Sequence, residues 1–159
     1  MLISRPHWKM LFLLILLFAG LSGVIVATAQ TAEGGYEPRS GDARIDRHLA
    51  DINDYAGRYP ASFVDEMARY YTVPRPYVEA MLQQPNWTAG DIYMACALAR
   101  VAGQPCRAVV REWSRDHSDG WKSVAERLDV KPGSSQYRRL RKGIDETYGR
   151  WDRPAPAAD

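Results

Sequence analysis

Cysteine is scarce in this sequence. The chain of 159 residues contains only Cys96 and Cys106, and their spacing does not form a Cys-x-x-Cys motif. A redox-active pair of that type is therefore excluded. No cysteine stands directly after the apolar N-terminal stretch, so the chain lacks the lipid-attachment site of a lipoprotein.

Histidine is also rare, which leaves few ligands for a metal ion. Beyond the N-terminal stretch only His48 and His117 remain, and neither has a partner at metal-ligand spacing. His117 lies between Asp116 and Asp119, a combination that could hold a cation loosely, but a solvated loop explains the same residues. We predict no metal ion and no cofactor.

The chain has no large excess of charge of one sign. Its formal net charge is +2, from 21 basic and 19 acidic residues, and two of the basic residues, Arg5 and Lys9, lie near the N-terminus. The rest of the chain is close to neutral, which argues against nonspecific nucleic-acid binding. Only residues 131–153 are clearly basic.

Only one long hydrophobic run is present. Basic residues precede an apolar stretch over residues 10–26, and Ala27-Thr28-Ala29 follows it, which is typical of a signal peptide cleaved after Ala29. We therefore predict that residues 1–29 are a signal peptide and that the protein is periplasmic or secreted, with no transmembrane segment after cleavage. Because residues 10–29 are about long enough to cross a bilayer, an uncleaved anchor is the alternative.

Alternation of apolar and polar residues, the mark of a half-buried strand, is absent. Apolar residues instead recur at helical spacing through most of residues 42–150. The sequence predicts an all-α fold, a compact bundle of about six or seven short helices. Residues 30–41 and 151–159 are rich in Gly, Pro, Ala or polar residues and are predicted to be a flexible linker and a flexible tail.

Proline and capping residues indicate where helices begin and end. Pro60 is expected to end the first helix, and Ser62 with Asp65 resembles a capping box that would begin the second. Thr88 with Asp91 forms another capping pair. The helix after it is apolar without a break over residues 92–99, so we expect it to be the central helix.

The two cysteines fall on either side of a predicted helical hairpin, which Gly103 and Pro105 would form. In an oxidising compartment an isolated pair of cysteines is usually bridged. Straight antiparallel helices would nevertheless leave the two residues offset, and a disulfide needs Cα atoms within about 7 Å. The sequence is therefore compatible with either a disulfide between the two cysteines or two buried thiols.

A weak internal repeat aligns residues 64–74 with residues 121–131. Each copy reads as a helix, a tight turn closed by a valine, and a second helix. The repeat predicts helix-turn-helix-like corners in the bundle. It also suggests nucleic-acid binding through Arg75 or the basic residues 138–142, although export and the near-neutral charge argue against that function.

Aromatic and basic residues supply the candidate binding groups. Trp113 and Trp121 occupy apolar stripes and should be buried, whereas two other tryptophans lie in a loop and in the tail. The candidate binding residues are Trp87, Trp151, Arg138 and Arg139.

Single carboxylates are the only candidates for acid catalysis. They are Glu66, Glu79, Asp91 and Glu112. A glycan-cleaving enzyme needs two facing carboxylates, and nothing in the sequence pairs these four. Asp91 is better explained as a helix cap, and Glu79 and Glu112 as solvated helix faces. We assign no catalytic residue.

Residues 61–143 resemble small exported bacterial proteins of uncharacterised function with an all-helical domain. The shared pattern is GWxx[VI]AxxLx[VI]KPGS, present here as Gly120, Trp121, Val124, Ala125, Leu128, Val130 and Lys131-Pro132-Gly133-Ser134. The resemblance implies export and a compact helical bundle, and it supplies no catalytic residue.

Together these features predict an exported helical protein that acts as a structural or protein-binding component of the cell envelope, with an envelope protein as its expected partner. A peptidoglycan-acting enzyme is the first alternative. A nucleic-acid-binding helix-turn-helix protein is the second, and an acidic cleft or a steep salt dependence of DNA binding would distinguish them.

Overall fold

The computed structural model describes residues 35–157, and this part of the chain forms seven helices and no strand. The helices are α1 (Ala43–Arg58), α2 (Pro60–Tyr71), α3 (Arg75–Leu82), α4 (Ala89–Ala102), α5 (Cys106–Arg115), α6 (Trp121–Arg127) and α7 (Ser135–Arg150). The predicted all-α fold is confirmed. The predicted signal peptide, residues 1–29, lies outside the described residues, as do linker residues 30–34.

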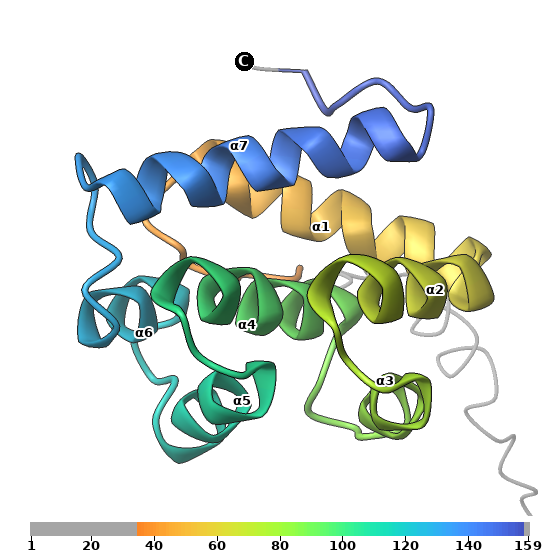
Figure 1. The fold of residues 1–159 in the computed structure, drawn as a ribbon, viewed down its shortest axis with the longest axis horizontal. Helices are drawn as coiled ribbons and strands as arrows, with labels where there is room; N and C mark the ends of the chain where they lie inside the picture. The colour runs from red at the N-terminus through yellow and green to blue at the C-terminus, as the bar shows by residue number, and fades with distance from the viewer. Residues whose placement is uncertain (1–34, 158–159) are drawn as a thin grey trace, which may run out of the picture. The chain divides into compact units, whose positions relative to one another are not determined.

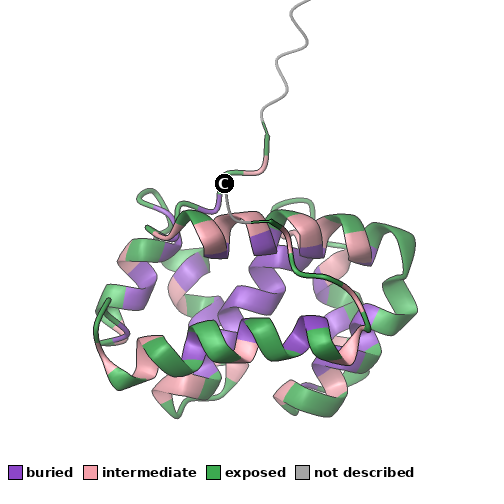
Figure 2. Ribbon diagram, turned by 90° about the horizontal axis from the view of Figure 1, so that it is seen from above, coloured by how far each residue is buried: buried purple, intermediate pink, exposed green. Residues whose placement is uncertain are grey.

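The helices lie in three layers (Figure 1). Helices α1 and α7 form one outer layer, α3 and α5 form the other, and α2, α4 and α6 lie between them. Every residue from 89 to 99 in α4 is buried, and Figure 2 shows the buried colour concentrated on the helix at the centre. The prediction of a central helix is confirmed, because only a surrounded helix can be apolar on all sides.

The helix starts confirm the predicted Thr88–Asp91 cap and correct the predicted Ser62–Asp65 cap. The side chains of Thr88 and Asp91 form a capping box at the start of α4, and Ser134 caps α7 by accepting from the amide of Tyr137. The expected Ser62–Asp65 cap is wrong, since α2 already begins at Pro60. Proline is well suited to the first position of a helix, so Ser62 falls inside the first turn.

The two copies of the internal repeat form matching corners. The residue before the closing valine is left-handed in both, with φ of 55° at Thr72 and 57° at Asp129. The next residue is a buried valine, Val73 or Val130. The valines plug the two corners as the repeat predicts, so the repeat is explained by packing.

The segment before α1 is packed, although its composition suggests a flexible linker. The Tyr36 hydroxyl donates to Asp91 Oδ1 at 2.8 Å, and the amide of Trp121 donates to the Pro38 carbonyl at 2.9 Å. Backbone carbonyls of this segment thus satisfy amides at the start of α6, a function that composition does not reveal. Gly120 permits the approach, because a Cβ atom there would lie 2.7 Å from the Pro38 carbonyl oxygen.

The residues after α7 also contact the bundle. The Trp151 ring stacks on Tyr55 of α1 with centroids 4.0 Å apart. The Arg153 guanidinium lies 2.8 Å from an oxygen of Asp51. The first part of the predicted flexible tail is therefore held against α1.

The Cys96–Cys106 disulfide is formed, with the two Cα atoms 4.4 Å apart. It joins α4 to the first residue of α5. The offset expected of straight antiparallel helices does not occur. The predicted turn is present, with a left-handed φ of 70° at Gly103.

Candidate functional site

A hollow that combines charged side chains with aromatic rings runs beside the C-terminal half of α4. Its first lobe has a volume of about 540 Å³ and lies between the α2–α3 corner and the α4–α5 corner. The lining residues used below are Tyr70, Tyr71, Tyr77, Arg100, Cys106 and Arg107.

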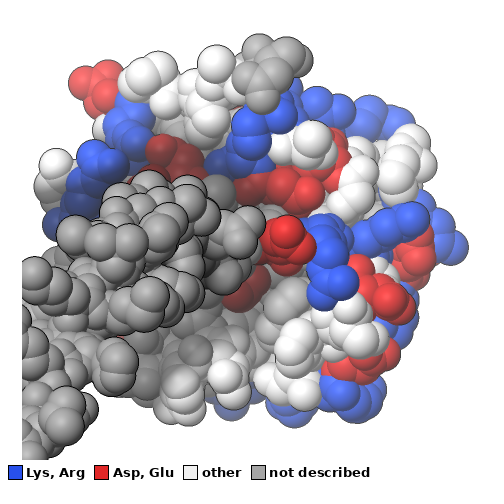
Figure 3. Space-filling model, turned by 180° about the vertical axis from the view of Figure 1, so that it is seen from behind, with Lys and Arg blue, Asp and Glu red and all other residues white. Residues whose placement is uncertain are grey.

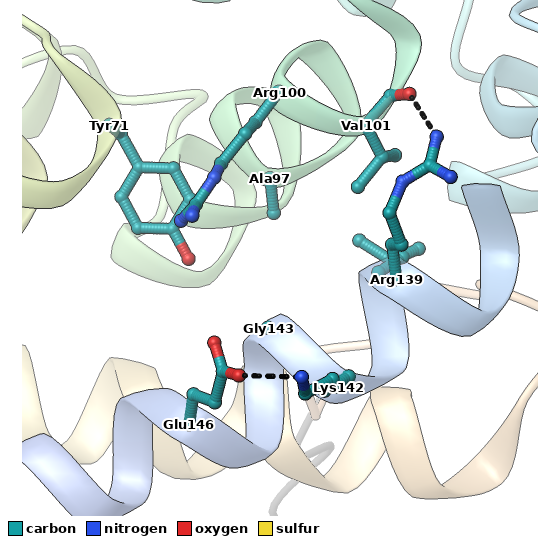
Figure 4. Close-up of a pocket in the computed structure, with 9 residues that line it drawn as sticks. Tyr71, Ala97, Arg100, Val101, Arg139, Lys142, Gly143 and Glu146 are labelled. Carbon is teal, nitrogen blue, oxygen red and sulfur yellow. Dashed lines mark hydrogen bonds and ion pairs between the residues drawn. The ribbon is translucent and has the colours of Figure 1, made fainter. Parts of the chain in front are cut away.

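A second lobe of about 390 Å³ lies between α4 and α7 (Figure 4). Its lining includes Arg139, Lys142 and Glu146 of α7. Tyr71 and Arg100 line both lobes, so the two hollows adjoin at these side chains. We call the combined hollow the α4 cleft.

Positive charge is left uncompensated in the α4 cleft. Within residues 35–157, Arg100, Arg107 and Arg139 form no ion pair with a carboxylate, and all three are exposed. Arg139 reaches only the Val101 carbonyl, at 3.5 Å, and the Ser135 hydroxyl, at 3.4 Å. Figure 3 shows charges of both signs intermixed on the face of the molecule seen from behind.

One cation of the cleft has a partner of its own. Lys142 lies 3.5 Å from Glu146, one turn further along α7, and both side chains are largely exposed. Such a pair contributes little energy and is readily exchanged for another partner. It therefore adds to the rim of the cleft without neutralising the three arginines.

Tyrosine rings lie beside these arginines. The Arg100 guanidinium is 5.8 Å from the centre of the Tyr71 ring, and Arg107 is 5.9 Å from that of Tyr77. Burial raises the pKa of both phenols, and the effect on Tyr77 is opposed by Arg107 and Arg111. Both hydroxyls consequently stay protonated at neutral pH and can donate hydrogen bonds.

A buried ion pair supports the edge of the cleft. Arg150 donates to the Glu66 carboxylate through Nε, at 2.9 Å, and through a second nitrogen, and its guanidinium lies 4.2 Å from the centre of the Tyr70 ring. Burial tends to lower the pKa of Arg150, but the Glu66 carboxylate raises it. Glu66, a candidate acid from the sequence, thus has a structural partner.

The other candidate carboxylates lie apart from one another. Asp91 is buried and accepts hydrogen bonds from Tyr36, Thr88 and Trp121, which confirms its capping function and extends it. Glu112 pairs with Arg115 at 2.9 Å, and Glu79 is exposed on α3.

The candidate binding residues are also divided. Arg139 lines the α4 cleft, whereas the neighbouring Arg138 points to the Gly133 carbonyl at 2.7 Å. Trp87 is half-buried and lies outside the cleft. Trp151 is also half-buried and lines a different hollow near the end of α7. Trp113 and Trp121 are buried, as predicted, and stack with centroids 3.9 Å apart.

Sequence reasoning missed three residues of the cleft, Tyr71, Arg100 and Arg107. One signal was available for Arg100, which is the first charged residue after the unbroken apolar run of α4. Its position marks the point where the central helix reaches the surface. Nothing in the sequence indicates that Tyr71 and Arg107 meet it there.

Residues 35–157 contain neither a candidate metal cluster nor a candidate membrane-spanning helix. No group of three His, Cys, Asp or Glu side chains could hold a metal ion there. None of the helices in that range has the length and apolar character needed to span a membrane.

Comparison with known proteins finds no match to this chain. No protein-family model, no curated protein and no solved structure matches it.

Proposed function

We propose that the chain is an exported, non-enzymatic component of the cell envelope and that its α4 cleft binds an acidic segment of a partner protein. The observation that carries this proposal is the convergence of Arg100, Arg107 and Arg139, without carboxylate partners, on a cleft lined by tyrosines. The pattern shared with small exported helical proteins belongs to the same proposal.

The disulfide and the N-terminal sequence both support export. A structural disulfide persists in oxidising compartments and is rare in the cytosol. Residues 1–29 have the basic start, apolar stretch and small-residue cleavage site of a signal peptide. These two features are independent of each other.

The chemistry of the cleft suits an acidic peptide. Arginine binds carboxylates through two parallel hydrogen bonds, and tyrosine and arginine are enriched at the centres of protein interfaces. The two lobes extend from α3 to α7 around Arg100, so they favour a linear segment over a compact ligand. An extended segment with several Asp or Glu residues would neutralise the three arginines.

The two alternative functions have less support. Glu66 and Asp91 are occupied by structural partners, and of the two remaining candidates Glu112 pairs with Arg115 while Glu79 is exposed on α3, which gives little support to a peptidoglycan-acting enzyme. Arg75, the basic residue of the first helix-turn-helix corner, is paired with Asp65.

The test uses two arginines of the cleft, Arg100 and Arg139, and one arginine outside it, Arg138. In-cell crosslinking and pull-down from the envelope fraction is performed with the native chain and with Arg139→Glu, Arg100→Glu and Arg138→Glu. The three variants change the net charge equally, but Arg138 lies outside the cleft. We expect the first two to lose the crosslinked partner and Arg138→Glu to retain it. Equal loss in all three would indicate nonspecific charge attraction, and retention in all three would exclude the cleft.

A further inference from the structure

A second hollow, separate from the α4 cleft, lies where α1 ends and α2 begins. Its volume is about 420 Å³, within the range of about 300 to 1,000 Å³ typical of small-molecule sites. It is lined by Tyr55, Arg58, Tyr59, Ser62, Trp151 and Arg153. We call it the α1–α2 hollow.

Aromatic rings form one side of this hollow. Tyr55 stacks on Trp151 at 4.0 Å and contacts Tyr59 with centroids 5.4 Å apart. Tyr59 is 55% exposed, the highest value for a large hydrophobic side chain within the described residues. An exposed aromatic ring at the edge of a stack offers a flat apolar surface to a ligand.

The polar groups of the hollow are hydrogen-bond donors without partners. Among residues 35–157, Arg58 forms no ion pair, and the hydroxyls of Tyr59 and Ser62 form no hydrogen bond. The indole nitrogen of Trp151 is buried and lacks a hydrogen-bond partner as well. Arg153 differs, since Asp51 holds it over the Tyr55 ring at 5.3 Å.

These features define the ligand by its chemistry. No carboxylate lines the α1–α2 hollow, so cationic ligands are disfavoured and an acceptor-rich, negatively charged ligand is favoured. The ligand also needs an apolar face to cover the Tyr59 ring. A compact hollow beside one unpaired guanidinium fits a single charged ring better than an extended peptide.

We propose that the α1–α2 hollow binds a sugar ring that carries a carboxylate. The apolar face of the ring would pack on Tyr59, its hydroxyls would accept from Ser62 and Tyr59, and its carboxylate would pair with Arg58. The proposed export would bring the protein into contact with envelope glycans. Export is the one part of the proposed function on which this inference rests. The site does not depend on the α4 cleft.

The test compares two sugars that differ by one acidic group. N-Acetylmuramic acid is N-acetylglucosamine with an added lactyl ether, which supplies the carboxylate. Titration calorimetry with the purified protein should show the acidic sugar binding at least about tenfold more tightly, as expected for one charge-assisted hydrogen-bonded pair. Arg58→Ala should abolish this difference, and Tyr59→Ala should weaken binding of both sugars.

Two controls separate this proposal from the function of the α4 cleft. Arg139→Glu should leave sugar binding unchanged, and Arg58→Ala should leave the crosslinked partner unchanged. Because Trp151 lines the hollow, its indole N–H resonance should shift on addition of the acidic sugar. Equal affinity for the two sugars, an unchanged difference in Arg58→Ala, or a tetraglutamate peptide that displaces the acidic sugar would each overturn the proposal.

Discussion

Replacement of Asp91 tests how the N-terminal segment, α4 and α6 are held together. Its carboxylate accepts from the Tyr36 hydroxyl at 2.8 Å, from the Trp121 indole nitrogen at 2.8 Å and from the Thr88 hydroxyl at 2.7 Å. The side chain is only 5% exposed. Asp91→Ala removes every one of these acceptors at once.

The size of the effect follows from what each donor loses. Trp121 is fully buried, so its indole N–H would remain without a partner, at a cost of about 1–3 kcal/mol. Loss of the capping box contributes about 1 kcal/mol more. The half-buried Tyr36 can turn to water and adds less. We expect a total of about 3 kcal/mol for Asp91→Ala, and about 1 kcal/mol for Asp91→Asn, which retains one acceptor oxygen.

Urea and thermal unfolding, followed by circular dichroism, measure this difference. A loss of about 3 kcal/mol corresponds to a fall in Tm of roughly 10 °C for a domain of this size. Asp54→Ala is the control, because Asp54 is an exposed acidic residue of α1. A loss below about 1 kcal/mol in Asp91→Ala, or equal losses in Asp91→Ala and Asp91→Asn, would refute the reasoning.

Three further predictions concern the disulfide, acid stability and the turn before α6. Reduction of the disulfide, or Cys96→Ser, should lower the unfolding free energy by about 2–3 kcal/mol, and unchanged melting in reductant with two titratable thiols in the unreduced unfolded protein would contradict this. Burial raises the pKa of Asp42, but hydrogen bonds from Tyr137 and two backbone amides lower it by more than burial raises it. The pKa of Asp42 is therefore lower in the folded state than in the unfolded state. Its stabilisation is therefore complete above the unfolded pKa and is lost as the pH falls through the folded pKa, so unfolding curves of the native chain and Asp42→Asn should converge in acid. Gly120→Ala should cost about 2 kcal/mol or more in urea unfolding, because φ of 75° and ψ of −166° suit only glycine and a Cβ atom would lie 2.6 Å from that of Arg39.

Much of the fold was predictable because the signals are local. The unbroken apolar run of residues 92–99 requires a surrounded helix, and the Thr88–Asp91 capping pair marks its start. The start of α2 was mispredicted because Pro60 serves equally well as a helix stop and as a first helical residue. The composition of the N-terminal segment predicts flexibility, although the segment contacts the bundle through the Tyr36 hydroxyl and through backbone carbonyls, and the carbonyls do not vary with sequence.

The candidate site was much less predictable than the fold. Arg100 and Arg139 are far apart in the sequence, and they meet only because α7 packs across α4. Arg138 and Arg139, which the sequence predicts as a pair, separate because adjacent residues of a helix point in different directions. A basic cluster in sequence therefore indicates a charged helix, and the tertiary packing decides which of its members share a cleft.

Glu66 shows how a candidate catalytic residue can be distinguished from a structural one. If the Glu66–Arg150 pair serves to support α2 against α7, the two side chains should be energetically coupled. Removing one partner leaves the other charge unpaired. The losses of unfolding free energy in Glu66→Gln and Arg150→Gln should therefore add up to more than the loss in the double variant.

A double-mutant cycle in urea measures that coupling, which we expect to be about 1 kcal/mol or more for residues in direct contact. Lys142→Gln and Glu146→Gln provide the control cycle, because that pair is exposed and should couple by only a few tenths of a kcal/mol. Additive losses at Glu66 and Arg150 would mean that the ion pair does not support the packing of α2 on α7. Glu66 would then again be available as a chemical group, and the case for an envelope enzyme would be reopened.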